Sequence, residues 1–282
     1  MNYLLLALMA LFLTGQNIVK KKYRQISSSG VCFFSAMTVS FAILVFAACN
    51  RNWHIEVRFV LPAVAFAFFY AMATVGFLAA IRHGSLANSS LVIAYSLLIP
   101  TFYGLIFLKE SIDAKLIAGL VLIAVSLWLT NYQSGGGRIT WKWVVFISMG
   151  FVGNGMCTTV QKISTNTYGQ ENMDLIMVMS LLFAVVLLLV SSFVLKEKEL
   201  VSVSLKKGWH LALACGVMNG VTNMLVIYMN DRLPASVMFP VLSGGNLIMI
   251  FLYSLLVLRE RFTKRQYIGY FLGLASVIML NL

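Results

Sequence analysis

Long apolar stretches follow one another through this sequence with little polar sequence between them. The runs at 59–81 and 176–195 each approach or exceed the roughly 20 residues that a helix needs to cross the hydrocarbon core of a bilayer. Hydrophobic residues make up 60% of the chain and charged residues 11%, whereas soluble domains are about one quarter charged. No water-soluble core would bury this much apolar surface. We therefore predict an all-α polytopic membrane protein.

The formal net charge of +12 would suggest a nucleic-acid partner in a soluble protein. In a membrane protein, Lys and Arg instead gather in short cytoplasmic loops. We therefore expect no nucleic acid, and we expect the partners to be the lipid bilayer and a small-molecule substrate. The 4 cysteines and 3 histidines show no metal-ligand spacing, so neither a metal nor a cofactor is expected. A monomer is the working expectation for the oligomeric state, which the sequence leaves open.

Charge clusters and turn residues divide the chain into ten apolar segments, which we predict to be ten transmembrane helices. Some are shorter than 20 residues, but spans of about 17 are tolerated. The most linker-like stretch is polar and glycine-rich and occupies 132–142. The predicted spans are 2–19, 30–49, 59–81, 87–108, 116–131, 143–161, 173–195, 209–229, 235–258 and 267–282.

A short charged motif occurs once on each side of this linker. It reads "LKES" at 108–111 and "LRER" at 258–261, and its glutamates stand 150 residues apart. We interpret each motif as the turn between the fourth and fifth helix of a repeat, at the membrane surface, where charge is tolerated better than at depth. At this spacing Leu108, Glu110, Gly119, Leu122, Ser126 and Asn131 match Leu258, Glu260, Gly269, Leu272, Ser276 and Asn281.

The starts of the two halves match more weakly, at a spacing of 140 residues that pairs Gly15 with Gly155 and Lys22 with Lys162. We therefore predict a first five-helix repeat at 1–131 and a second at 143–282. Five is an odd number, so the second repeat must be inverted in the membrane, as in many transporters.

The basic residues are unevenly distributed among the loops. The odd-numbered loops contain 15 Lys and Arg and the even-numbered loops 6, when the residues from Lys20 to Arg24 are assigned to the first loop. By the positive-inside rule, this predicts cytoplasmic odd-numbered loops and two termini outside the cytoplasm.

This pattern resembles the drug/metabolite transporter superfamily in its ten-helix, EamA-type form. The resemblance rests on the duplicated five-helix unit, the Leu-x-Glu turns and the glycines nine residues later, Gly119 and Gly269. It implies a transporter, not an enzyme, in the inner (cytoplasmic) membrane of a cell. Members of the superfamily move amino acids, nucleosides, vitamins, choline-like cations or toxic metabolites. They are usually drawn with both termini in the cytoplasm, which is opposite to our charge count.

A transporter site is expected where helices are interrupted by Gly or Pro at the interface of the repeats. The ninth segment reads "LPASVMFPVLSGGNLIM", which suggests a local irregularity near 243–245, and its counterpart reads "LANSSLVIAYSLLIP". Gln16 and Asn17 fall near the end of the first predicted span, so we expect them at the rim. Polar groups in these spans bind substrate or hydrogen-bond neighbouring helices, and both interpretations stay open. The predicted substrate-binding residues are Tyr70, Tyr95, Ser96, Asn154, Asn219, Asn223, Ser243 and Asn246.

All 9 acidic residues lie in predicted loops or at span ends. No carboxylate is therefore expected at depth to bind a cation or carry a coupling proton. This favours a transporter that moves a small neutral or zwitterionic polar metabolite, amino-acid-like or related, by alternating access. The alternatives are a lipid scramblase or flippase, and an exporter of cationic drugs or metabolites. An enzyme is disfavoured because no paired acids, Ser/His pair or metal cluster is expected at depth.

Overall fold

The structure is a computed structural model of the 282-residue chain. It describes residues 2–26, 30–49, 53, 55–107, 118–119, 121–122, 125–126, 128–129, 140–195, 204–230 and 235–279. Every secondary-structure element within these residues is helical. By length and composition, five of the described helices are able to span a membrane. The prediction of an all-α membrane protein is confirmed at this level.

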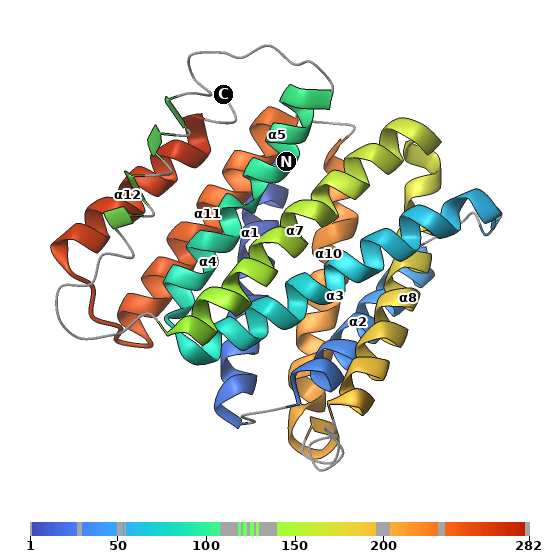
Figure 1. The fold of residues 1–282 in the computed structure, drawn as a ribbon, viewed down its shortest axis with the longest axis horizontal. Helices are drawn as coiled ribbons and strands as arrows, with labels where there is room; N and C mark the ends of the chain where they lie inside the picture. Colours follow the sequence, from blue (N-terminus) through green and yellow to red (C-terminus); the bar gives the residue numbers. More distant parts are fainter. Residues whose placement is uncertain are drawn as a thin grey trace.

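Figure 1 shows the order of the elements along the chain. Four of them, η1 to η4, are single turns, of which η4 is π-helical and the others are 3-10 helices. Their bounds are α1 Asn2–Ile26, α2 Val31–Cys49, η1 Val57–Phe59, α3 Val60–His83, α4 Leu86–Ala94, η2 Tyr95–Leu97, α5 Leu98–Phe107, α7 Trp141–Tyr168, η3 Gln170–Asn172, α8 Met173–Val194, η4 Ser204–Gly208, α10 Trp209–Asn230, α11 Ala235–Leu256 and α12 Lys264–Met279.

Two helices are longer than the sequence predicted. We placed the end of the first span at residue 19, but α1 continues to Ile26. We limited the sixth span to 143–161, but α7 runs from Trp141 to Tyr168. Polar residues do not end a helix by themselves, because the backbone hydrogen bonds continue and long side chains extend toward water. Lys20 therefore belongs to a helix and not to the first loop.

The fourth predicted span is broken, whereas the ninth is not. The 3-10 turn at Tyr95–Leu97 separates α4 from α5. Pro100 follows within α5 and has no N–H to donate to the carbonyl four residues earlier, which favours an interruption at this point. In contrast, α11 is continuous from Ala235 to Leu256. The prediction of an irregularity near 243–245 is therefore wrong, and the small residues there belong to a regular helix.

Equivalent helices of the two halves have equivalent neighbours. α3 packs against α7 and α8, and its counterpart α10 packs against α1 and α2. α1 packs against α11, and α7 packs against α4 and α5. In Figure 1, α12 lies at one edge of the molecule, α2 and α8 lie toward the opposite edge, and α3 and α7 cross the middle.

The crossing of α3 and α7 depends on glycines at the contact. A Cβ atom added to Gly76 would lie 2.6 Å from the backbone nitrogen of Gly150, and one added to Gly153 would lie 2.5 Å from that of Ala73. Neither separation is compatible with a real side chain. Small residues of this kind allow membrane helices to approach closely. The close crossing positions α3 and α7 beside the central cavity described below.

Candidate functional site

A cavity of about 330 Å³ lies among α1, α3, α4, α7, α10 and α11. We call it the central cavity. Its volume is within the range of about 300–1,000 Å³ that small-molecule sites occupy. Apolar and aromatic side chains, including Phe66 and Phe77, form part of its wall. Its polar and thiol-bearing lining residues are Gln16, Asn17, Lys20, Tyr70, Thr74, Ser90, Asn154, Cys157, Thr158, Gln161, Asn219, Thr222, Asn223 and Asn246.

An amide network joins three helices at this cavity. The side-chain nitrogen of Asn219 donates to Oε1 of Gln16 at 3.0 Å, which connects α10 to α1. Asn219 Oδ1 accepts from the amide nitrogen of Asn223 at 3.2 Å and from the Tyr70 hydroxyl at 3.5 Å. Asn219 and Asn223 are one turn apart on α10 and therefore share a face. Asn219 is the centre of the network, because it contacts all three partners.

Two further asparagines each bond to a neighbouring helix. Nδ2 of Asn154 donates to Oγ of Ser96 at 2.6 Å, which joins α7 to the turn after α4. The Thr14 hydroxyl donates to Oδ1 of Asn246 at 3.0 Å, which joins α1 to α11. Each asparagine uses one end of its amide in this bond. The other end has no partner within the described part of the chain, so it remains available to a ligand.

Two polar atoms at the cavity are buried without a hydrogen-bond partner among the described residues. They are Nε2 of Gln16 and Oγ of Ser90, in side chains that are 3% and 4% exposed. A buried polar group without a partner destabilises a protein by about 1–3 kcal/mol. Such groups are rare in folded proteins. Both atoms are shielded from the open space of the cavity in this structure, so a polar ligand would bond to them after their side chains turn toward it.

Lys20 is the cationic side chain of this cavity within the described residues. Its ammonium lies 5.6 Å from the centroid of the Phe77 ring, in a cation–π arrangement. No acidic residue is present in the described lining. The neighbouring Lys21 is different, because its ammonium donates to the Ile81 carbonyl at 3.3 Å. We had assigned Lys20 to a loop, and the continuation of α1 to Ile26 is the reason that it lies at the cavity.

Five of the predicted site residues line the central cavity, namely Tyr70, Asn154, Asn219, Asn223 and Asn246. Gln16 and Asn17, which we expected at the rim, also line it. Lys20 was missed, although Gln16, Asn17 and Lys20 follow the i, i+1, i+4 spacing of one helix face. That spacing was the signal available in the sequence.

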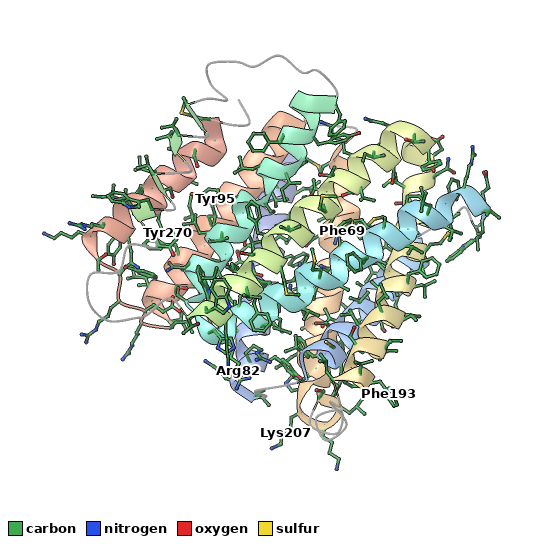
Figure 2. The ribbon with its side chains drawn as sticks, viewed as in Figure 1. Phe69, Arg82, Tyr95, Phe193, Lys207 and Tyr270 are labelled. Carbon is green, nitrogen blue, oxygen red and sulfur yellow. The ribbon has the colours of Figure 1, made fainter. Side chains whose placement is uncertain are left out.

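Two predicted residues point elsewhere. Tyr95 is buried, and its hydroxyl bonds to Oγ of Ser126 at 2.6 Å. Figure 2 shows it near Tyr270, toward the α12 edge of the molecule. Ser96 is buried behind Asn154 and does not line the cavity. The 3-10 turn winds more tightly than an α-helix, so the face expected from an unbroken helix is not kept. The side chain of Ser243 lies outside the described residues.

One end of the helix bundle is joined by contacts between the two halves. The Ser85 hydroxyl donates to Oε2 of Glu260 at 2.9 Å, and Nε1 of Trp143 donates to the Ser89 hydroxyl at 3.0 Å. Basic residues gather here, and Figure 2 shows Arg82 and Lys207 at this end. We call it the joined end. The partner motif around Glu110 lies outside the described residues.

The buried apolar side chains are arranged differently at the two ends. At the joined end, one cluster extends over α1, α2, α3, α4, α7, α10, α11 and α12. At the opposite end, the described residues form two clusters. One contains Leu6, Met229 and Leu242 of α1, α10 and α11, and the other contains Phe59 and Ile176 beside α3 and α8. A fourth cluster connects α2 and α3 with α7 and α8. In the described part of the chain, each cluster therefore contains side chains of both halves, and the cluster at the joined end extends over the most helices.

Comparison with known proteins agrees with this architecture. The EamA-like transporter family model matches residues 1–132 and 141–282. A solved structure described as "Crystal structure of protein" superposes with a TM-score of 0.63 at 10% identity, over 97% of this chain and 98% of that one. At this identity the likeness shows the fold alone. No curated protein matches the chain. The resemblance inferred from the repeated motifs is confirmed, and the chain belongs to the EamA-like transporter family, as a multi-pass membrane protein of the drug/metabolite transporter type.

Proposed function

We propose that this protein is a secondary transporter that moves a small polar metabolite, neutral overall or zwitterionic, across the inner membrane of a cell. It acts without a cofactor and is not an enzyme. The observation that carries the proposal is the central cavity, which both halves of the chain line with amides and hydroxyls. Amides in an apolar helix bundle need partners, because an unpaired polar group is costly in hydrocarbon. A polar substrate supplies those partners.

The mechanism that we propose is alternating access between two inverted five-helix repeats, 1–131 and 143–282, with ten transmembrane helices in all. The recurring neighbours support it, since α3 with α7 and α8 corresponds to α10 with α1 and α2. In this mechanism the contacts between the halves at the joined end keep that end closed, and the substrate enters from the opposite end. Transport requires contacts such as Ser85–Glu260 to open while the other end closes.

Charge at the cavity favours this substrate class over a cationic drug. A site for a cation needs a carboxylate or an aromatic cage. The described lining has no carboxylate and carries Lys20, whose charge repels cations. An exporter of cations is therefore the weaker interpretation of this cavity.

The test begins with thermal unfolding of the purified protein against amino acids, nucleosides, choline-like cations and neutral sugars. A ligand that binds only the folded state raises apparent stability, by about 2.7 kcal/mol at one hundred times its Kd. We expect amino-acid-like compounds to stabilise most. The best ligand, radiolabelled, should then enter proteoliposomes that contain the protein and not empty liposomes.

A matched variant connects the uptake to the cavity. Asn219→Ala should reduce uptake, whereas Ser180→Ala should not. The Ser180 hydroxyl bonds to the Ile176 carbonyl within α8, and Ser180 does not line the cavity. Strongest stabilisation by a quaternary ammonium compound would overturn the substrate class. Transfer of a fluorescent phospholipid between leaflets, with no solute uptake, would favour a scramblase and overturn the transporter.

A further inference from the structure

The charge of Lys20 has no counter-ion within the described residues. The described lining contains no Asp or Glu, and the ion pair that the structure describes, Arg58 with Glu56, is elsewhere. The side chain of Lys20 is partly buried and contacts the face of Phe77. A charge that is removed from water without a partner is unfavourable. Lys20 is therefore set up to receive an anion from within the cavity.

Two further side chains of the central cavity carry buried hydrogen-bonding atoms without a partner among the described residues. Gln16 precedes Lys20 by one helical turn, so the two side chains share a face of α1. Its Nε2 is a hydrogen-bond donor without a partner in the described structure, because its Oε1 is already used by Asn219. Oγ of Ser90 on α4 is likewise unpartnered, and a hydroxyl can donate. All three side chains line the central cavity.

The amides of the second half offer the opposite kind of group. Asn154 and Asn223 each donate their side-chain nitrogen to a neighbour, Ser96 and Asn219 respectively. Their carbonyl oxygens have no partner among the described residues, and both side chains line the cavity. Amide oxygens accept hydrogen bonds from an ammonium group. The cavity thus has donors and a cation on α1 and α4, and acceptors on α7 and α10.

We propose that Lys20, with Gln16 and Ser90, is the binding subsite for a single negatively charged group of the substrate, a carboxylate. The ammonium of Lys20 balances one negative charge, and the two neutral groups add hydrogen bonds. A phosphate dianion would leave one negative charge unbalanced, so it fits this subsite less well. The ammonium of a zwitterion would then bind the oxygens of Asn154 and Asn223. This inference rests on the proposed transporter function and specifies its substrate class as amino-acid-like carboxylates.

The experiment compares amino acids with their carboxamides, which keep the ammonium and lose the negative charge. Affinities are measured by thermal shift on the purified wild type and on Lys20→Gln, Lys20→Arg and Lys21→Gln. A charge-assisted hydrogen bond contributes about 1.5–3 kcal/mol, so the wild type should prefer the carboxylate by about tenfold or more. Lys20→Gln should reduce that preference to less than about threefold. Lys20→Arg should keep most of it.

Lys21→Gln is the control for charge, since Lys21 is adjacent in sequence but bonds to the Ile81 carbonyl outside the cavity. It should keep the wild-type preference for carboxylates. Equal preference in Lys20→Gln and wild type would overturn the subsite. Tighter binding of methyl phosphate than of acetate would overturn its assignment to a carboxylate.

The failure of this inference is distinguishable from failure of the proposed function. If carboxamides bind and are transported as well as the acids, the transporter stands and the Lys20 subsite is wrong. If neither series binds and no solute is transported, both proposals are wrong. Binding of the acids with a Lys20-dependent preference, but without transport, keeps the subsite and removes the transporter.

Discussion

The two halves of the chain build chemically different walls of the same cavity. The wall from the first half contains Lys20 and three aromatic residues, Phe66, Tyr70 and Phe77. The described wall from the second half has neither a charge nor an aromatic residue, and its polar character comes mainly from Asn154, Asn219, Asn223 and Asn246. Helices that correspond in the repeat therefore carry different chemistry. A repeated framework is compatible with a substrate whose two ends differ.

The contrast is clearest between α1 and α7, the first helices of the two halves. At the spacing that pairs Gly15 with Gly155, Lys20 corresponds to Val160. α1 faces the cavity with Lys20 near one end, whereas α7 faces it with Asn154 and other uncharged residues. The repeat predicts which helices meet. The side chains at each position decide which ligand the cavity binds.

The largest effect is expected from removing the close approach that holds the walls together. Gly153→Leu places a side chain against the backbone of Ala73, because a Cβ atom at residue 153 would lie 2.5 Å from the Ala73 backbone nitrogen. Overpacking of this kind destabilises by about 1–3 kcal/mol or more. Thermal unfolding should show a clear decrease in Tm. Ligand binding should be lost as well, because both walls of the cavity contribute to it.

Gly15→Ala is the matched control, because its Cβ would meet the flexible end of Met218, which is able to move. It should change Tm much less. If Gly153→Leu unfolds at the wild-type temperature, the α3–α7 crossing is not the contact that maintains the cavity.

The second-largest effect, on substrate affinity, is expected at Asn219, which connects the two walls by hydrogen bonds. Asn219→Ala removes the side-chain hydrogen bonds to Gln16, Tyr70 and Asn223, although Nδ2 of Asn223 keeps its bond to the backbone carbonyl of residue 219 at 2.9 Å. Buried groups left without partners cost about 1–3 kcal/mol each, so substrate affinity should decrease by about tenfold or more. Equilibrium binding of the best ligand measures this. A wild-type affinity would show that the network is only structural.

Asn246→Ala separates packing from binding in the second wall. Its Oδ1 accepts from Thr14, and its side chain also lines the cavity. One lost hydrogen bond contributes about 0.5–1.5 kcal/mol, or about two- to tenfold in affinity. We expect weaker ligand binding by the folded variant, measured alongside Tm. Lost stability with unchanged affinity would remove Asn246 from the binding site.

The smallest effect is expected at the joined end. Glu260→Gln replaces the charged acceptor of the Ser85 hydroxyl by a neutral one. Because the bond is only partly buried, weakening it should change stability by less than about 1 kcal/mol. The transport rate is the more sensitive readout, since a weaker Ser85–Glu260 hydrogen bond favours opening at this end. An unchanged rate would show that Ser85–Glu260 does not contribute to closure.

The sequence alone was sufficient for the class of the protein and for much of the cavity wall. Long apolar runs require membrane helices, and the repeated Leu-x-Glu turns led to the family that the comparison then confirmed. Tyr70, Asn219 and Asn223 were predicted for a general reason. A polar side chain in an apolar span avoids lipid, so it faces the interior whatever the details of packing.

Only the tertiary structure decided where individual helices end or break and what those changes expose. Lys20 is in the wall because α1 continues to Ile26, and the charge cluster at that point looked like a loop. Tyr95 turns toward Ser126 because a 3-10 turn changes the winding of the chain. Sequence periodicity reports a face only while the helix stays regular. The length of a helix past its apolar run depends on neighbours that are distant in the sequence, such as Phe77 beside Lys20.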